Sequence, residues 1–247
     1  MAEAPFLYEP LNVLKAVADN VWIADGPRID MAMAGFAMPF PTRMTLVRLE
    51  GGALFVHSPI APDAGLLEQV AGLGDVRFLI APNSLHYWFM PDWKARFPGA
   101  LVFAVPGLAQ KAKRPLVVDR VLEDAPPPEW QGQIDQVLFP GSVMTECDFF
   151  HLASGTVILT DLIENFEAAR IKSPLLRALM WLAHVMAPHG SAPYDMRLNF
   201  WRQRKAMRAG VARLLAWPAR RVILAHGRWY PEQGGRELAR AFAWAIH

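Results

Sequence analysis

The chain has 247 residues, of which 53% are apolar and 19% are charged, and its formal net charge at pH 7 is +2. This composition is typical of a globular protein somewhat rich in core residues, and we expect one domain over residues 1–247. A net charge so close to zero argues against a nucleic-acid partner. The single cysteine, Cys147, excludes an intrachain disulfide framework and a metal site made only of cysteines.

The N-terminal residues have neither the basic region nor the apolar run of a secretory signal, and no window is long and apolar enough for a membrane-spanning helix. Together with the lone cysteine, these features favour a cytoplasmic protein. A small-molecule ligand or substrate is the expected partner. Membrane contact is not expected, and oligomer formation stays open.

The first stretch with strand character runs from Val13 to Asp25, where apolar residues alternate around Trp22. This alternation predicts a strand that Gly26-Pro27 closes. The segment from Pro27 to Pro41 holds five methionine and phenylalanine side chains. Because exposed apolar side chains are a liability, we expect a loop here that packs over the core or over the mouth of a pocket.

Two β-rich runs, 42–50 and 53–58, flank Gly51-Gly52. Both glycines tolerate positive φ, so the dipeptide predicts a tight hairpin turn. Residues 63–71 have helical spacing behind a capping aspartate, and residues 76–81 return as a buried strand. This region therefore reads as strand, helix, strand.

A polar and aromatic loop follows that strand. It begins at Pro82, continues with Asn83 and Ser84, and reaches His86 among large aromatic residues. Loops at the carboxyl ends of strands commonly carry the chemistry of α/β proteins, so His86 is the first candidate functional residue. His57 closes the second hairpin strand and either faces the same site or hydrogen-bonds locally.

Two further strands end in side chains of metal-ligand type. A turn at Ser154-Gly155 predicts a hairpin whose return strand, 156–161, ends in Asp161. Burial of an unpaired charge costs several kcal/mol, so Asp161 should meet a cation, a donor cluster or a metal, or should cap the following loop. The run 221–227 predicts a last strand that ends in His226-Gly227.

Two helices stand out by their composition. Residues 173–187 begin with a serine cap and a proline and are apolar nearly all round, which predicts a helix buried on several sides. An oligomer contact and a membrane-surface element are the alternatives for this helix. Residues 199–217 predict one long helix whose basic face lies opposite an apolar stripe, and a solvated face is the usual reason for that pattern.

His86, Asp161 and His226 each follow a buried strand, and neighbouring strands bring such ends together. Two imidazoles and a carboxylate with open positions suit Zn, Fe or Mn, and a metal held there would polarise a bound water. The spacing of the three residues along the chain does not by itself establish a site.

Several short motifs stand in a characteristic order along the chain: Gly51-Gly52, His57-Ser-Pro59, Ala81-Pro-Asn-Ser-Leu-His86 with Trp93 and Pro98, Glu146 with Phe149-Phe-His151, Ser154-Gly-Thr156, Leu159-Thr-Asp-Leu162 and Ala225-His-Gly227. This order resembles the metallo-β-lactamase superfamily, and more closely the uncharacterised DUF4336 group related to it, over most of the chain. The resemblance implies an α/β (α+β) fold, the four-layer αββα sandwich of the metallo-β-lactamase type.

The metal loop of that superfamily normally reads Thr-His-x-His-x-Asp-His, and this chain departs from it. In the best register, Ser84 stands at the first histidine and His86 at the second. Trp88 stands at the aspartate and Phe89 at the last histidine. Loss of the loop aspartate removes the group that orients the attacking water in the family.

Of the remaining metal-ligand positions of the family, one is lost and two are kept. The third histidine of the pattern falls on Ser142, whereas the bridging aspartate and the final histidine match Asp161 and His226. In the two-metal arrangement that the resemblance implies, neither metal keeps a full set of ligands.

Two functional interpretations follow. In the first, the three ligand-type residues hold a single Zn, Fe or Mn ion, with help from Asn83, Glu146 or His151. The protein is then a metal-dependent hydrolase of an ester, thioester or amide, and the three residues are catalytic. In the second, the fold is kept without a metal, and the polar cluster binds a small ligand or a partner, or only holds loops together.

Trp88 and Phe89 favour the metal-free interpretation, because apolar rings at these positions are expected to fill space that a metal and its water need. A third interpretation starts from the apolar helix after Ser173 and the basic helix after Asn199, which together would dock on a membrane or a partner. The basic residues of the second helix also suit an ordinary exposed face.

Overall fold

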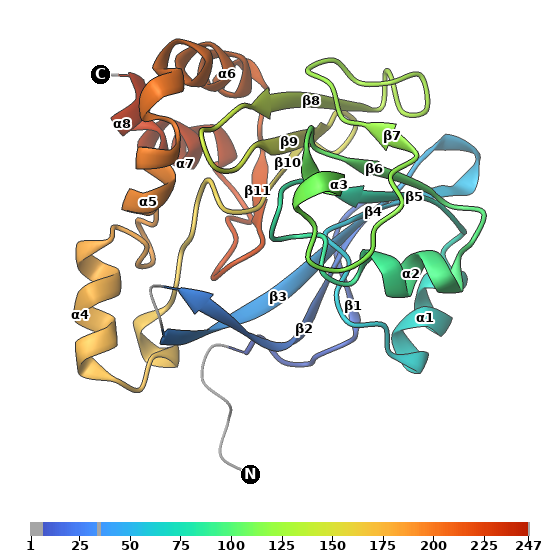
Figure 1. Ribbon diagram of the computed structural model, residues 1–247, viewed down its shortest axis with the longest axis horizontal. Coiled ribbons are helices and arrows are strands. Elements are labelled where there is room, and N and C mark those ends of the chain that lie inside the picture. Colours follow the sequence, from blue (N-terminus) through green and yellow to red (C-terminus); the bar gives the residue numbers. More distant parts are fainter. Residues whose placement is uncertain (1–6, 34–35, 247) are drawn as a thin grey trace.

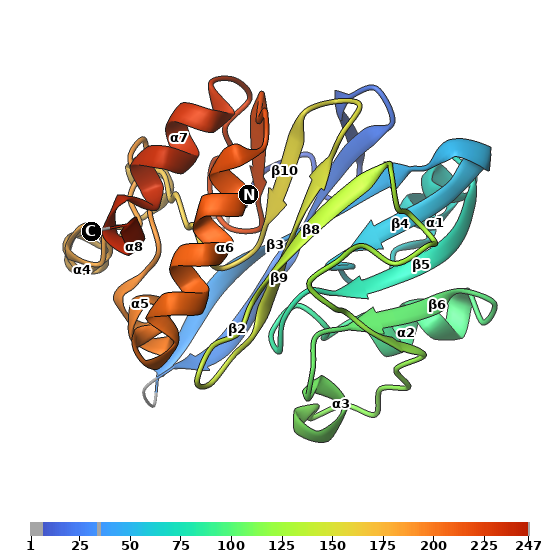
Figure 2. The ribbon, with the colours of Figure 1, turned by 90° about the horizontal axis from the view of Figure 1, so that it is seen from above.

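Two β-sheets pack face to face in the computed structural model, which describes residues 7–33 and 36–246 (Figure 1). Helices α1 (Ala64–Ala71) and α2 (Met90–Arg96) lie on the outer side of one sheet. Helices α6 (Arg204–Ala216) and α7 (Gly234–Ala241) lie on the outer side of the other, as Figure 2 shows. The predicted αββα sandwich is confirmed.

The first sheet keeps its strands in chain order and runs antiparallel from β1 to β4 and parallel from β4 to β7. Its strands are β1 (Leu14–Ala18), β2 (Val21–Met33), β3 (Phe36–Arg48), β4 (Ala53–His57), β5 (Asp75–Ala81), β6 (Leu101–Ala104) and β7 (Arg120–Val121). Parallel neighbours need crossover connections, and α1 and α2 supply those that flank β5.

The second sheet has the order β11, β10, β9, β8. Its strands are β8 (Ile134–Phe139), β9 (Glu146–His151), β10 (Thr156–Leu159) and β11 (Arg221–Leu224). β9 and β10 pair antiparallel around the predicted Ser154-Gly155 turn, whereas β10 and β11 pair parallel. The carboxyl ends of β10 and β11 therefore lie side by side, which brings the segments after them to one edge.

The inner faces of the two sheets share an aromatic core. Phe55 of β4 lies 5.2 Å from Phe149 of β9 and 5.1 Å from Trp130, measured between ring centroids. Trp130 also contacts Phe103 of β6 at 4.6 Å. All four side chains are buried. Edge-to-face rings of this kind hold the sheets at a fixed separation, so the loops at their ends start from a rigid frame.

Local signals at the first hairpin and helix are confirmed. Gly51 and Gly52 have φ of 83° and 86° in the turn between β3 and β4. The Asp63 side chain accepts a hydrogen bond from the backbone N–H of Leu66 at 3.2 Å and caps α1. Each signal depends on residues within a few positions of one another, which is why it could be read locally.

The predictions for the N-terminal segment need correction. The predicted first strand is two strands, β1 and β2, joined by a turn at Asp19-Asn20. The segment from Pro27 to Pro41 is no loop: β2 and β3 continue through it as a long hairpin with a bulge between Gly26 and Ile29. The bulge accommodates Pro27, which cannot donate a ladder hydrogen bond. The expected packing of the side chains at 31–39 lies outside the described part of the chain.

The predicted apolar helix is shorter and more exposed than expected. It forms α4 (Pro174–Leu182), capped by Ser173, and of its side chains only Met180 is buried. Leu175 and Trp181 are 70% and 69% exposed. Composition alone gives the helix but does not tell how many of its faces the rest of the chain covers, so the prediction of burial on several sides is wrong.

The predicted long basic helix is divided. The chain forms α5 (Tyr194–Asn199), a 3₁₀ turn at Trp201–Gln203 and then α6. The break occurs where Phe200, with φ of −97° and ψ of 2°, leaves helical geometry and is buried in an apolar cluster with Phe139 of β8 and Val211 of α6.

The remaining helices are short. They are α3 (Leu108–Lys111) after β6 and α8 (Ala243–Ile246) after α7. Within the described residues, none of the helices has the length and hydropathy that crossing a bilayer requires.

Candidate metal centre

Three side chains from distant parts of the chain meet at one end of the sandwich. His86 lies in the loop after β5, Asp161 follows β10 and His226 follows β11. The Nε2 atoms of His86 and His226 are 3.2 Å apart. Asp161 Oδ1 lies 3.2 Å from His86 Nε2 and 3.1 Å from His226 Nε2. These three atoms form a nearly equilateral triangle. Among the described residues, the three side chains form a group that could hold a metal ion.

The second nitrogen of each imidazole has a partner that points its Nε2 at the triangle. His226 Nδ1 lies 3.0 Å from the carbonyl oxygen of Pro41, which only accepts, so Nδ1 carries the proton and Nε2 presents a lone pair. His86 Nδ1 lies 2.6 Å from the Ser58 hydroxyl oxygen. The backbone of Ser58 adopts a φ of 52°, a conformation that residues other than glycine seldom take. Such backbone conformations occur most often at functional sites.

The electrostatics of the triangle are those of a charged group held between imidazoles. Burial by itself would raise the pKa of Asp161, but the two histidines outweigh burial and hold that pKa well below its usual range. Burial would lower the pKa of His86, yet the Asp161 carboxylate raises it overall. Asp161 is therefore ionised, and the triangle attracts one positive charge, either a proton or a metal ion.

The triangle meets the distance requirement of a metal centre. Zinc binds imidazole nitrogen and carboxylate oxygen at about 2.0 to 2.2 Å with tetrahedral geometry, so neighbouring ligand atoms stand about 3.3 to 3.5 Å apart. Sides of 3.1 to 3.2 Å between the three donor atoms are close to that value. Two neutral imidazoles and one carboxylate are also a usual donor set for Zn, Fe and Mn. The residues present therefore fit one ion.

Asn83 and Glu146, two of the suggested additional ligands, support Asp161 from behind. The Asn83 amide nitrogen donates to Asp161 Oδ2 at 2.7 Å, and its oxygen accepts from the backbone N–H of His86 at 2.9 Å. Glu146 Oε1 accepts from the backbone N–H groups of three consecutive residues, Thr160 to Leu162, at 3.0 to 3.3 Å. Neither side chain enters the triangle; both fix the ligands, as outer partners of a metal centre do.

A buried ion pair fixes the loop that carries His226. Arg43 donates through Nε to Asp25 at 2.8 Å and through Nη1 to the carbonyl oxygens of Leu224 at 2.6 Å and Gly227 at 2.8 Å. Gly227 has a φ of 88°, and a Cβ atom there would stand 2.2 Å from a backbone oxygen of the neighbouring segment. Strand β3 thereby ties the first sheet to the end of β11.

A narrow cleft of about 30 Å³ opens beside His86 and His226. That volume holds about one water molecule, and the mouth is lined by apolar side chains that include Leu85, Trp88 and Phe89. Trp88 is 42% exposed, and the Arg114 guanidinium lies over its ring. The Trp88 ring lines the cleft and stays partly exposed, so it does not lie between the three donor atoms, and whether Trp88 and Phe89 leave room for a metal and its water stays a prediction.

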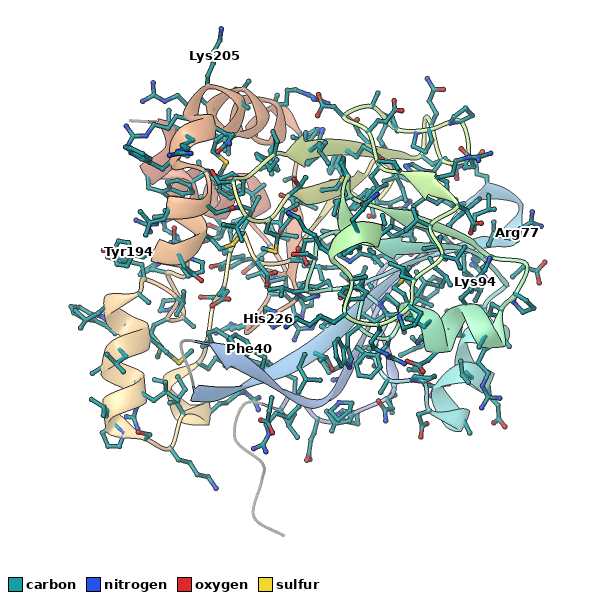
Figure 3. All side chains as sticks on the ribbon, in the orientation of Figure 1. Phe40, Arg77, Lys94, Tyr194, Lys205 and His226 are labelled. Atoms are coloured by element: carbon teal, nitrogen blue, oxygen red, sulfur yellow. The ribbon has the colours of Figure 1, made fainter. Side chains whose placement is uncertain are left out.

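Phe40 closes the site from the other side. Its ring lies 5.3 Å from that of His226, and the two are labelled side by side in Figure 3. Phe166 stacks on His226 at 6.4 Å. Apolar rings around the imidazole exclude water from the triangle and strengthen its electrostatic interactions.

The other sequence candidates lie elsewhere. His151, at the far end of β9 from Glu146, has its Nδ1 2.8 Å from the Ser154 hydroxyl and supports the turn of the hairpin. The His57 ring packs on Phe149, and burial lowers its pKa to about 3. Its Nε2 has no hydrogen-bond partner within the described structure. The Ser142 hydroxyl bonds to Gln203, away from the triangle.

Sequence reasoning gave no role to Ser58, Arg43 or the carbonyl of Pro41. A signal existed for Arg43, because a charged residue within the apolar run of β3 requires a buried partner. Ser58 was noticed only as part of a motif. No local pattern marks a backbone carbonyl as the partner of a histidine.

Comparison with protein families gives one match. The family model described as a domain of unknown function, DUF4336, matches residues 19–195, well over half of the chain. The chain belongs to the DUF4336 family. The match includes His86 and Asp161, whereas His226 lies beyond it. A search among curated proteins finds no match for this DUF4336 chain.

Solved structures place this DUF4336 chain in the metallo-β-lactamase fold. DIM-1 metallo-β-lactamase exposed to ceftazidime is 12% identical with a TM-score of 0.63, and the alignment covers 98% of both chains. A metallo-β-lactamase from Hirschia baltica is 15% identical with a TM-score of 0.61, covering 95% of this chain and 97% of that one. FIM-1 from Pseudomonas aeruginosa in its mono-zinc form is 14% identical with a TM-score of 0.58, covering 94% of both.

Proposed function

We propose that this protein is a single-metal hydrolase of an ester, thioester or amide. The observation that carries the proposal is the triangle of His86, His226 and Asp161, whose three donor atoms converge at 3.1 to 3.2 Å from one another. Zn, Fe or Mn suits these donors. The mono-zinc form of FIM-1 supports the proposal to the extent that its fold also occurs with one zinc ion.

The roles of the chain's own residues follow from their contacts. A bound ion would act as a Lewis acid and make its water a nucleophile near neutral pH. Pro41 and Ser58 hold the two imidazoles with their Nε2 atoms toward the ion. Asn83 fixes Asp161 through the oxygen that does not face the imidazoles. The small cleft admits only the reacting group, so the rest of a substrate lies against the apolar mouth around Trp88.

A second function is supported by the same distances. A doubly protonated His86 would donate from Nε2 toward Asp161 Oδ1 and His226 Nε2, both 3.2 Å away. The raised pKa of His86 favours that proton. The cluster is then a metal-free, non-catalytic arrangement that binds a small ligand or a partner at the cleft, or only holds loops together.

Elemental analysis separates the two functions. Protein purified without a metal-affinity tag should hold about one equivalent of Zn, Fe or Mn, which a chelator removes together with thermal stability. Asp161→Ala and His226→Ala should lose the metal, whereas His151→Ala, a buried histidine outside the triangle, should keep it. Ester, thioester and amide substrates are then compared on the loaded protein. Failure of the native chain to retain any metal after incubation with each ion would overturn the hydrolase and leave the metal-free function.

A further inference from the structure

The outer surface around α4 and α5 exposes an unusual number of large apolar side chains. Fifteen such side chains are exposed in the described structure, and seven of them fall between residues 175 and 201. We call these seven the apolar face: Leu175, Leu179, Trp181, Leu182, Tyr194, Leu198 and Trp201, each between 51% and 71% exposed. A cluster of this kind on a soluble surface marks an interaction site.

The apolar face stands on a well-anchored element. Leu175, Leu179 and Leu182 are spaced four and three residues apart, so they share one side of α4. Met180, on the inner side, is buried in a small core with Phe40 and Phe166. The outward leucines are therefore held in place by packing behind them rather than by contacts of their own.

The same region carries a strong positive charge. Residues 171–220 contain nine lysines and arginines and a single acidic residue, Asp195, which gives a formal charge of +8. The whole chain carries +2, so the rest of the sequence carries −6. Within the described structure, Arg177, Arg202, Arg204 and Lys205 form no ion pair with a carboxylate. Such a division of charge indicates an anionic partner.

A cavity of about 360 Å³ opens within this surface, between α5, α6 and α8. Three arginines and four large aromatic residues line it, and no acidic residue does. The Arg197 guanidinium lies over the rings of Tyr194 at 5.1 Å and Trp244 at 5.4 Å, and that of Arg204 lies over Trp201 at 5.8 Å. Trp244 Nε1 is buried without a hydrogen-bond partner in the described structure. Guanidinium groups beside aromatic rings suit a phosphate with an apolar neighbour.

We propose that this face docks on a membrane of anionic phospholipid, with the leucines and tryptophans in the interfacial region and a phosphate headgroup in the cavity. Aromatic and leucine side chains bordered by arginine and lysine are the composition of interfacial membrane-binding elements. Figure 1 shows α4 and α5 at one outer edge of the molecule, and Figure 3 shows Tyr194 projecting outward from that edge.

A second copy of the chain fits this surface less well. A two-fold dimer would place the same basic region against itself, and like charges in contact oppose association. The membrane proposal does not depend on a metal in the His86 triangle, because none of the residues of the apolar face lies in that site.

Vesicle flotation tests the proposal with the full chain. The native protein should float with vesicles containing one-third phosphatidylglycerol in phosphatidylcholine, and much less with phosphatidylcholine alone or at high salt. The variant L175S/L179S should lose about tenfold or more in vesicle affinity, and R204E/K205E should lose a similar factor on the anionic vesicles only. The control V117S/V121S changes two valines that are 70% and 56% exposed in β7 and the segment that leads into it, and it should bind like the native protein.

Two results would overturn the proposal: no flotation of the native protein, or equal loss in the control. Binding of glycerol phosphate by protein that does not float would make the cavity a site for a free phosphate. A concentration-dependent dimer that L175S/L179S disrupts, in protein that does not float, would assign the face to self-association. Far-ultraviolet circular dichroism of each variant establishes that the fold is intact before its vesicle affinity is compared.

Discussion

Two regions of the molecule break the rule of apolar inside and polar outside in opposite directions. Around the carboxyl ends of β5, β10 and β11 the chain buries Asp161, His226 and Glu146 and partly buries His86. On α4 and α5 it exposes the seven side chains of the apolar face. Most buried polar atoms of the first region have partners within the chain, as Glu146 does with the backbone N–H groups of Thr160 to Leu162. In the second region, the described chain leaves more than half of each side chain exposed.

The difference indicates where each region obtains its stabilisation. Buried charges that are hydrogen-bonded from several sides are part of the fold, and their removal leaves unsatisfied groups behind. Exposed leucines contribute little to the fold of the isolated chain, so their effect appears only when something binds them. Substitutions in the first region should therefore change stability, and substitutions in the second should change binding.

The largest expected effect comes from removing Glu146. In Glu146→Ala, the backbone N–H groups of Thr160, Asp161 and Leu162 lose their acceptor inside the core. We expect a loss of about 3 to 5 kcal/mol in the free energy of unfolding, measured by urea denaturation. Glu146→Gln keeps an acceptor oxygen and should lose less. A loss below about 1 kcal/mol for the alanine variant would contradict the view of Glu146 as a structural centre.

The free energy of unfolding of the metal-free protein should fall as pH rises, whereas the stabilisation that a bound metal adds should grow. The raised pKa of His86 means that the folded metal-free protein binds an extra proton, so this contribution is present below about pH 6.5 and is lost as pH rises through the folded pKa. Metal binding needs neutral imidazoles, so the stabilisation by metal grows over the same range. At 100 times the dissociation constant it amounts to about 2.7 kcal/mol.

Thermal unfolding of chelator-treated and metal-loaded protein, from mildly acidic to alkaline pH, measures how the stability of each form depends on pH. Burial raises the pKa of Glu164 to about 8 and adds a slope of the same sign to the metal-free protein. Glu164→Gln separates the two, since it removes the Glu164 carboxyl group and leaves His86 beside Asp161. If the stability of the chelated Glu164→Gln variant no longer fell with rising pH, His86 would be excluded as the proton-binding group.

Much of the first region could be predicted from sequence because its information is local. The strands before His86, Asp161 and His226 show as apolar runs, and the parallel pairing of β10 and β11 brings the ends of these strands together. The supporting residues could not be found in this way. Arg43 contacts carbonyl groups 181 and 184 positions away, and no pattern within a window of sequence encodes a partner at that distance.

The second region shows the opposite limit. The apolar composition of residues 173–187 predicts a helix, and α4 forms over the first part of this range. Whether such a helix is buried depends on the number of elements that surround it, and here only the side with Met180 is covered. The hairpin of β2 and β3 was missed for a related reason: prolines and glycines suggested an end to the strand, whereas a bulge lets the strand continue.

The smallest expected effect tests the comparison between the two regions most directly, because it compares the free energies of unfolding of two variants in one helix. Leu179→Ser and Met180→Ala change neighbouring residues of α4, one 54% and the other 7% exposed. The first should change the free energy of unfolding by no more than about 0.5 kcal/mol, as surface substitutions usually do. The second leaves a cavity beside Phe40 and Phe166 and should cost about 2 kcal/mol or more. Parallel urea titrations measure both. A loss at Leu179 as large as that at Met180 would mean that the outer side of α4 is covered in solution even without a membrane, and the contrast between the two regions would then vanish.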